Sequence, residues 1–186
     1  MHSDDEKDLY ARAKEYDKEA LAELYDRYAE KIYSYVLRRV SGERLAEDIT
    51  ASVFTKMLDA IESSKAWNRS FSSWLYRIAH NAVVDYYRRK DKRETLPLDE
   101  RLVASDDNPV AVVEEDITME TVQGAMDYLT DAQRSVIELK FFEGLTNLEV
   151  ANILDKTEGA VKSLQYRALA SLRRHLEVGE KDAERA

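Results

Sequence analysis

Residues 146–162 read TNLEVANILDKTEGAVK, and this stretch decides how the rest of the chain is interpreted. Thr146 with Glu149 three residues later has the pattern of a capping box, in which each side chain satisfies a backbone N–H near the other. Thr157 can cap a second helix after Asp155-Lys156, where Asp tolerates the left-handed backbone conformation of a tight turn. Two helices joined by so short a turn predict a helix-turn-helix.

The second helix of this motif separates into two faces when it is wound at 3.6 residues per turn. Its apolar face holds Val161, Leu164, Ala168, Leu172 and Leu176, and its polar face holds Lys162, Ser163, Tyr166, Arg167, Arg173 and Arg174. A helix in the major groove needs cations for phosphates and hydrogen-bonding groups for base edges. The pattern therefore indicates a DNA-recognition helix, although an ordinary amphipathic surface helix has a similar pattern.

The charge of the chain is unevenly distributed. The net charge is −9, yet residues 67–93 carry seven Lys and Arg against two acidic residues, and residues 156–176 carry five against one. Residues 94–131 hold eleven Asp and Glu against Arg101 alone. Two basic segments separated by an acidic connector remain compatible with nucleic-acid binding, because the placement of charge matters more than its sum.

Helical spacing of apolar residues recurs over most of the chain, with helices expected at about 4–16, 18–40, 43–61, 70–92, 114–128 and 134–142. Thr130 with Gln133 forms a second capping-box pattern. Alternation typical of strands is not found, and Pro97 and Pro109 lie in the charged stretch 93–115. The prediction is an all-α fold in which a flexible acidic linker joins two small helical domains.

The helix expected at 70–92 combines aromatic and cationic residues. Arg77, Asn81, Arg88 and Lys92 form a polar stripe beside Trp74. Aromatic rings beside cations suit single-stranded nucleic acid, because each base offers a face for stacking. Aromatic residues at helical spacing are also typical of a core, so we expect Phe71 and Tyr86 to be buried and leave Trp74 open.

The composition argues against several other classes of protein. The chain has no cysteine, so it forms neither a disulfide nor a thiolate metal site, and its N-terminus is too acidic and polar for a signal peptide. His2, His80 and His175 are scattered and no Gly-rich phosphate loop is found, which argues against an enzyme with a cofactor or metal. We expect a soluble, cytoplasmic, non-enzymatic protein.

The chain resembles the bacterial sigma factors of the extracytoplasmic-function (ECF) group, in the sigma-70 family, over nearly its whole length. Its first domain is similar to the family's region 2 through Ala46-Glu47-Asp48-Ile49 and Trp74-Leu75-Tyr76-Arg77-Ile78-Ala79-His80-Asn81. Its second domain is similar to region 4 through Phe142-Glu143-Gly144-Leu145-Thr146 and Gly159-Ala160-Val161-Lys162-Ser163. The resemblance implies region 2 at 1–93, the linker at 94–115, region 4 at 116–178 and a tail at 179–186.

The resemblance also implies a function and its residues. The protein would bind core RNA polymerase, direct it to promoters and be restrained by an anti-sigma factor. The upstream (minus-thirty-five) element would be read by Thr157, Lys162, Ser163, Tyr166, Arg167 and Arg173. The melted minus-ten element would be held by Trp67, Asn68, Trp74, Arg77, Asn81, Arg88, Arg89 and Lys92. The polymerase clamp would contact Asp48, Ser52 and Lys56.

One alternative is a stand-alone helix-turn-helix regulator, which would use the same second domain. It gives no reason for the basic, aromatic helix at 70–92. Binding to promoter DNA without polymerase would favour the regulator, whereas a requirement for the core enzyme would favour the sigma factor.

Overall fold

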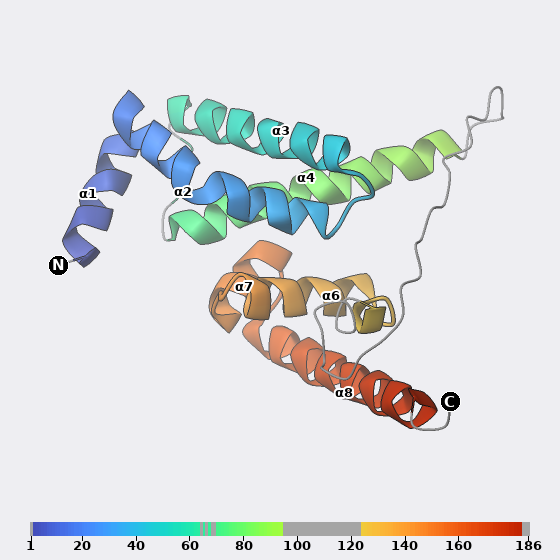
Figure 1. The fold of residues 1–186 in the computed structure, drawn as a ribbon. Helices are drawn as coiled ribbons and strands as arrows, with labels where there is room; N and C mark the ends of the chain where they lie inside the picture. The colour runs from blue at the N-terminus through green and yellow to red at the C-terminus, as the bar shows by residue number, and fades with distance from the viewer. Residues whose placement is uncertain (1, 64, 66, 68–69, 95–123, 184–186) are drawn as a thin grey trace.

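The computed structural model describes residues 2–63, 65, 67, 70–94 and 124–183. The helices α1–α4 form the first unit, and α6, η1, α7 and α8 form the second (Figure 1). In chain order they are α1 (His2–Lys14), α2 (Lys18–Leu37), α3 (Glu43–Glu62), α4 (Phe71–Glu94), α6 (Asp131–Ile137), the π-helical segment η1 (Glu138–Phe142), α7 (Asn147–Leu154) and α8 (Glu158–Ala183). The described residues form no strand, which confirms the all-α prediction.

In the first unit, a capping side chain or a turn precedes the start of α2 and of α3. The Asp17 side chain accepts a hydrogen bond from the Ala20 N–H at 2.8 Å and caps α2. Gly42, with a φ of 100°, precedes α3, and an L side chain would be strained there. The helix predicted to reach residue 40 ends at Leu37, because the chain tightens into a turn in which the Arg39 N–H bonds to the Val36 carbonyl.

The core of the first unit lies between α2, α3 and α4, which pack along one another. Tyr35, Val53, Met57 and Leu75 are among its fully buried side chains. As expected, Phe71 is buried, whereas Tyr86 is only partly buried.

The second unit confirms the capping predictions. Thr130 and Thr146 each complete a capping box, with Gln133 and Glu149 respectively. Asp155 adopts the left-handed conformation, with φ 52° and ψ 49°, and α8 follows after Lys156 and Thr157. The helix-turn-helix prediction is therefore confirmed as a fold.

The helix predicted at 134–142 is not a continuous α-helix. It changes after Ile137 into η1, where the Glu143 N–H reaches back five residues to the Glu138 carbonyl at 3.1 Å. Five consecutive residues, 135–139, are buried. A helix with one covered face cannot bury five in succession, so this segment must be covered on more than one side.

The covering on the second side comes from the first unit. The second unit packs against α4 through α7 (Figure 1), and it also contacts Arg38 and Arg39, which follow α2. Val136, Leu139, Val150 and Ile153 join the same buried cluster as the core of the first unit. Ile137 and Ala168 belong to a separate small cluster within the second unit.

Several predictions fall outside the described residues. These are Asn68, the side chain of Lys92, the linker after Glu94 and the start of the helix expected at 114–128, of which residues 124–126 are helical. None of the helices in the described part of the chain combines the length and apolarity that a membrane crossing requires.

Candidate nucleic-acid interface

The polar face of α8 is presented to solvent as the sequence predicts. Lys162, Ser163, Tyr166, Arg167 and Arg173 are all exposed, and Tyr166 has 77% of its surface free. The opposite face is anchored, since Val161 and Ala168 are fully buried and Leu164 and Leu172 are half-buried. The cations and the phenol therefore point away from the domain.

The first turn of α8 is held in place by its cap. The Ala160 N–H donates to the Thr157 hydroxyl at 3.2 Å, so Thr157 has a structural role whatever else it contacts. Lys162 pairs with Glu158 at 3.0 Å, but both side chains are largely exposed. A surface pair of this kind is weak, and phosphate oxygens can replace the carboxylate.

A second exposed polar stripe runs along α4. Arg77, Asn81, Arg88 and Arg89 are exposed, and Trp74 is half-buried beside them. Arg88 pairs with Asp85 at 3.1 Å on the surface. The stripe leaves three cations and an amide available to a nucleic-acid strand.

Trp67 is not part of this stripe. It is 4% exposed and lies in an aromatic cluster, with its ring centroid 4.7 Å from that of Phe71 and 5.4 Å from that of Trp74. Lys14 Nζ lies 5.1 Å from the centre of the Trp67 ring. Stacking of Trp67 on a base would require the ring to leave this cluster.

The residues predicted to contact the polymerase form a separate surface on α3. Asp48, Ser52 and Lys56 are each four residues apart and all exposed, so they lie along one side of the helix. A groove of about 400 Å³ opens between α2 and α3, lined in part by Tyr25, Tyr33 and Phe54.

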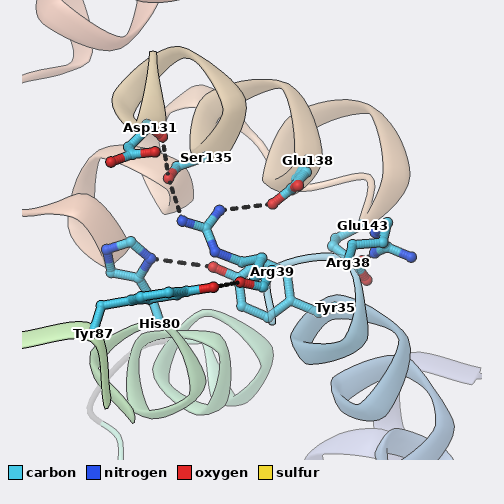
Figure 2. A network of polar contacts seen from close by, with 9 residues as sticks. All are labelled: Tyr35, Arg38, Arg39, His80, Tyr87, Asp131, Ser135, Glu138 and Glu143. Atoms are coloured by element: carbon cyan, nitrogen blue, oxygen red, sulfur yellow. Dashed lines mark hydrogen bonds and ion pairs between the residues drawn. The ribbon is translucent and has the colours of Figure 1, made fainter. Parts of the chain in front are cut away.

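The structure also brings together polar residues that the sequence did not single out (Figure 2). The Arg39 guanidinium donates to Glu138 at 2.7 Å and to the Ser135 hydroxyl at 3.0 Å. Glu143 pairs with Arg38 and also accepts a hydrogen bond from Tyr76. The one sequence signal for this network was a carboxylate, Glu138, inside an apolar run.

Burial in this network shifts several ionisation equilibria. Burial raises the pKa of Glu138, and the nearby Arg39 only partly offsets the effect. Burial also raises the pKa values of the Tyr35 and Tyr76 hydroxyls. The pKa of His80 falls to about 4, because its ring is partly buried and close to the Arg39 cation.

The described residues contain no group of His, Cys, Asp or Glu side chains arranged to hold a metal ion. The exposed faces of α4 and α8 carry cations, an amide, hydroxyls and an aromatic ring. Such groups bind phosphates and bases.

Comparison with known proteins identifies two family domains in this chain. The model of Sigma-70 region 2 matches residues 24–93, and that of Sigma-70, region 4 matches residues 125–174. Two relatives are ECF RNA polymerase sigma factors. BldN of Streptomyces coelicolor is 34% identical over 171 residues, which cover 91% of this chain and 65% of BldN. SigW of Bacillus subtilis is 33% identical over 175 residues, covering 89% of this chain and 93% of SigW.

Two solved structures share the fold. CnrH in complex with the cytosolic domain of CnrY aligns with a TM-score of 0.67 and 22% identity, over 91% of this chain and 96% of CnrH. The sigma factor RpoE of Bartonella quintana, in complex with the anti-sigma factor NepR, aligns with a TM-score of 0.65 and 19% identity, over 84% of this chain and 96% of the aligned chain.

Proposed function

This chain belongs to the ECF group of RNA polymerase sigma factors, in the sigma-70 family, and from that premise we propose that its two units divide promoter recognition between them. A sigma factor directs transcription initiation and has no catalytic chemistry of its own. The protein works in the cytoplasm, where the polymerase and the chromosome are.

Region 4 contacts the upstream element through α8. The observation that carries this proposal is the division of α8 into a face anchored by the buried Val161 and Ala168 and an exposed face with Lys162, Ser163, Tyr166 and Arg167. Such a helix packs on its own domain while its other face enters a major groove. Arg173, further along the exposed face, is placed to contact the backbone, and Thr157 holds the first turn.

Region 2 contacts the minus-ten element through α4 and the loop before it. Arg77, Arg88 and Arg89 supply charge for the strand backbone, and Asn81 supplies an amide for a base edge. Trp74 offers a partly exposed ring for stacking. Asn68 and Lys92 complete the proposed set, and Trp67 supports Trp74 from the aromatic cluster.

Region 2 also docks on the core polymerase. The stripe of Asp48, Ser52 and Lys56 on α3 is exposed and free of region 4, so a clamp surface can reach it. The protein partner that restrains this activity is an anti-sigma factor, as in the complex of RpoE with NepR.

Loss of single cations from α8 tests the upstream contact. Each phosphate contact that is lost lowers the slope of log affinity against log salt concentration by about one. Lys162→Ala and Arg167→Ala should therefore each reduce this slope when the protein is bound to polymerase. Titrations of a promoter duplex with the reconstituted holoenzyme at several salt concentrations measure the slope. Lys18→Ala, an exposed cation at the start of α2, is the control. Slopes equal to that of the wild type would place Lys162 and Arg167 off the DNA.

A further inference from the structure

The helix α1 precedes residues 24–93, the part of the chain that matches the family's region 2. Two of its residues, Leu9 and Ala13, are nonetheless buried and belong to the same cluster as the core of that region. The helix is therefore an integral part of the first unit. Its other contacts, made by Tyr10 and Lys14, reach the aromatic residues beside α4.

Tyr10 joins α1 to the aromatic residues around the start of α4. Its ring centroid lies 5.3 Å from that of Phe71, in a stacked arrangement, and 5.9 Å from that of Trp67, edge to face. The Tyr10 hydroxyl lies 3.2 Å from the Tyr28 hydroxyl of α2, which is a hydrogen-bonding distance. The ring is thus held between α2, α4 and Trp67.

Lys14 makes a second contact from α1 to Trp67. Its Nζ lies over the Trp67 ring, in the geometry of a cation–π interaction. Trp67 comes from the segment between α3 and α4 and not from a helix, so side-chain contacts of this kind determine where its ring lies. Tyr10 and Lys14 therefore help both to cover Trp67 and to hold it.

Trp67 in turn packs on Trp74, the ring that we assign to base stacking. Their centroids are 5.4 Å apart with the planes tilted by 46°, and Phe71 lies 5.9 Å from Trp74. A ring that is already held in one orientation loses less side-chain entropy when a base stacks on it than a ring that rotates freely. The contacts that α1 makes with Trp67 therefore affect how well Trp74 is prepared for a base.

We propose that Tyr10 and Lys14 of α1 are positioning residues for the minus-ten contact, which hold Trp67 and, through it, the stacking ring of Trp74. The proposal rests on the proposed function of Trp74. Neither residue of α1 has to touch the DNA, so both act on the step in which bases become available for stacking, which is strand opening. Formation of the closed complex on duplex DNA does not depend on them.

A small set of substitutions separates the ring from the charge. Tyr10→Leu removes the ring and keeps an apolar side chain, whereas Tyr10→Phe keeps the ring and loses the hydroxyl. Lys14→Met removes the charge from an exposed residue, so it leaves the buried side of α1 intact and stays informative if Tyr10→Leu misfolds. The matched controls are Tyr16→Leu, an exposed tyrosine just after α1, and Lys18→Met, an exposed lysine at the start of α2.

The first measurement is tryptophan fluorescence of the free protein. The chain has two tryptophans, Trp67 and Trp74, and they pack on one another, so the emission reports this cluster alone. Tyr10→Leu should shift the emission to longer wavelength and increase its quenching by acrylamide, because Trp67 gains contact with water. Tyr10→Phe and Tyr16→Leu should match the wild type. Wild-type emission and quenching in Tyr10→Leu would overturn the proposal, and this result requires neither promoter nor polymerase.

The second measurement is strand opening by the reconstituted holoenzyme, followed with a fluorescent base analogue in the minus-ten element. Loss of one base–aromatic stack changes an equilibrium by about fivefold or more, so we expect Tyr10→Leu to slow opening by about fivefold and Lys14→Met by less. Tyr10→Phe should restore the wild-type rate, and the affinity of the closed complex should be unchanged. A weaker salt dependence in Lys14→Met than in Lys18→Met would contradict the proposal, because Lys14 would then contact a phosphate directly.

Trp74→Ala separates positioning from a general loss of stability. If Tyr10 acts through Trp74, Tyr10→Leu should slow opening no further once Trp74 is replaced. Losses that multiply in the double variant would make Tyr10 a structural residue and refute the positioning role. Wild-type rates in both Tyr10→Leu and Lys14→Met, with slow opening in Trp74→Ala, would also refute it and leave the proposed function in place. Wild-type opening in Trp74→Ala would instead refute the proposed stacking role of Trp74, and the positioning role with it.

Discussion

His80 lies on α4 beside Tyr35 and near the Arg39 cation. Its Nδ1 lies 3.2 Å from the Tyr35 hydroxyl, and burial with the nearby Arg39 cation lowers its pKa to about 4. At neutral pH the ring is therefore uncharged, and it pairs with the tyrosine as a neutral hydrogen-bonding group.

This shift predicts acid sensitivity. The unfolded chain binds a proton at His80 near pH 6.5, whereas the folded protein binds it only near pH 4, so stability falls as the pH drops between these values. The full loss is about 3 kcal/mol. Denaturant titrations at a series of pH values measure it. Glu138, whose pKa is raised, changes the stability with pH in the opposite direction. The pH profile of the wild type is therefore compared with that of His80→Asn, which should lack the contribution of His80. Identical pH profiles for the two proteins would contradict the assignment.

Asn81 is the exposed amide of the α4 stripe, and its replacement tests the role of region 2 in strand opening. Asn81→Ala should leave formation of the closed promoter complex unchanged and slow the opening of the strands, because only an unstacked base presents its edge to the amide. Stopped-flow fluorescence of a base analogue in the minus-ten element follows opening. Glu62→Ala on the exposed end of α3 serves for comparison. Equal losses in both steps would make Asn81 a structural residue.

At the scale of elements, helix starts are set by local chemistry. Thr130→Ala removes the side-chain acceptor for the Gln133 N–H and should lower the free energy of unfolding by about 1 kcal/mol. Thr55→Ala, on the exposed face of α3, should change it by less than about 0.5 kcal/mol. Urea unfolding monitored by circular dichroism compares them. A Thr130 variant as stable as the Thr55 variant would mean that the cap is not needed for α6.

The same local chemistry explains what could be predicted from sequence. The starts of α6 and α7 were marked in the sequence by the capping boxes of Thr130 and Thr146, and the start of α2 and the two faces of α8 followed from apolar spacing. The π-helical segment η1 could not be predicted in this way. It buries Glu138 among apolar neighbours, and only the presence of Arg39 from region 2 makes that position tolerable.

The burial of one site residue, Trp67, could not be predicted from the sequence either. Residues of one exposed helix face, such as Arg77, Asn81 and Arg167, were placed correctly by periodicity. Trp67 comes from a loop, where no periodicity applies, and it packs into the aromatic cluster. Its burial depends on neighbours such as Phe71 and Trp74, which a spacing rule cannot identify for a loop residue.

At the scale of the whole molecule, the packing of region 4 on region 2 depends on pairs far apart in sequence. Arg39 and Glu138 are 99 residues apart, and Arg38 and Glu143 are 105 apart. Arg38, Arg39 and Glu143 lie just after helix ends, and Glu138 lies in η1. No local pattern pairs them, so the sequence predicted two units without their relative placement. The packing of region 4 on region 2 leaves α8 and the α4 stripe exposed, and it limits the distance between them.

The most direct test of the central claim is transcription from purified components. Core RNA polymerase, this protein and a pool of promoter fragments from the same genome are combined, and binding is measured in parallel without polymerase. The account predicts specific transcripts only when both proteins are present, with two shared sequence elements upstream of the start sites. Tight, specific duplex binding without polymerase, and no transcripts with it, would contradict the account and favour a stand-alone regulator.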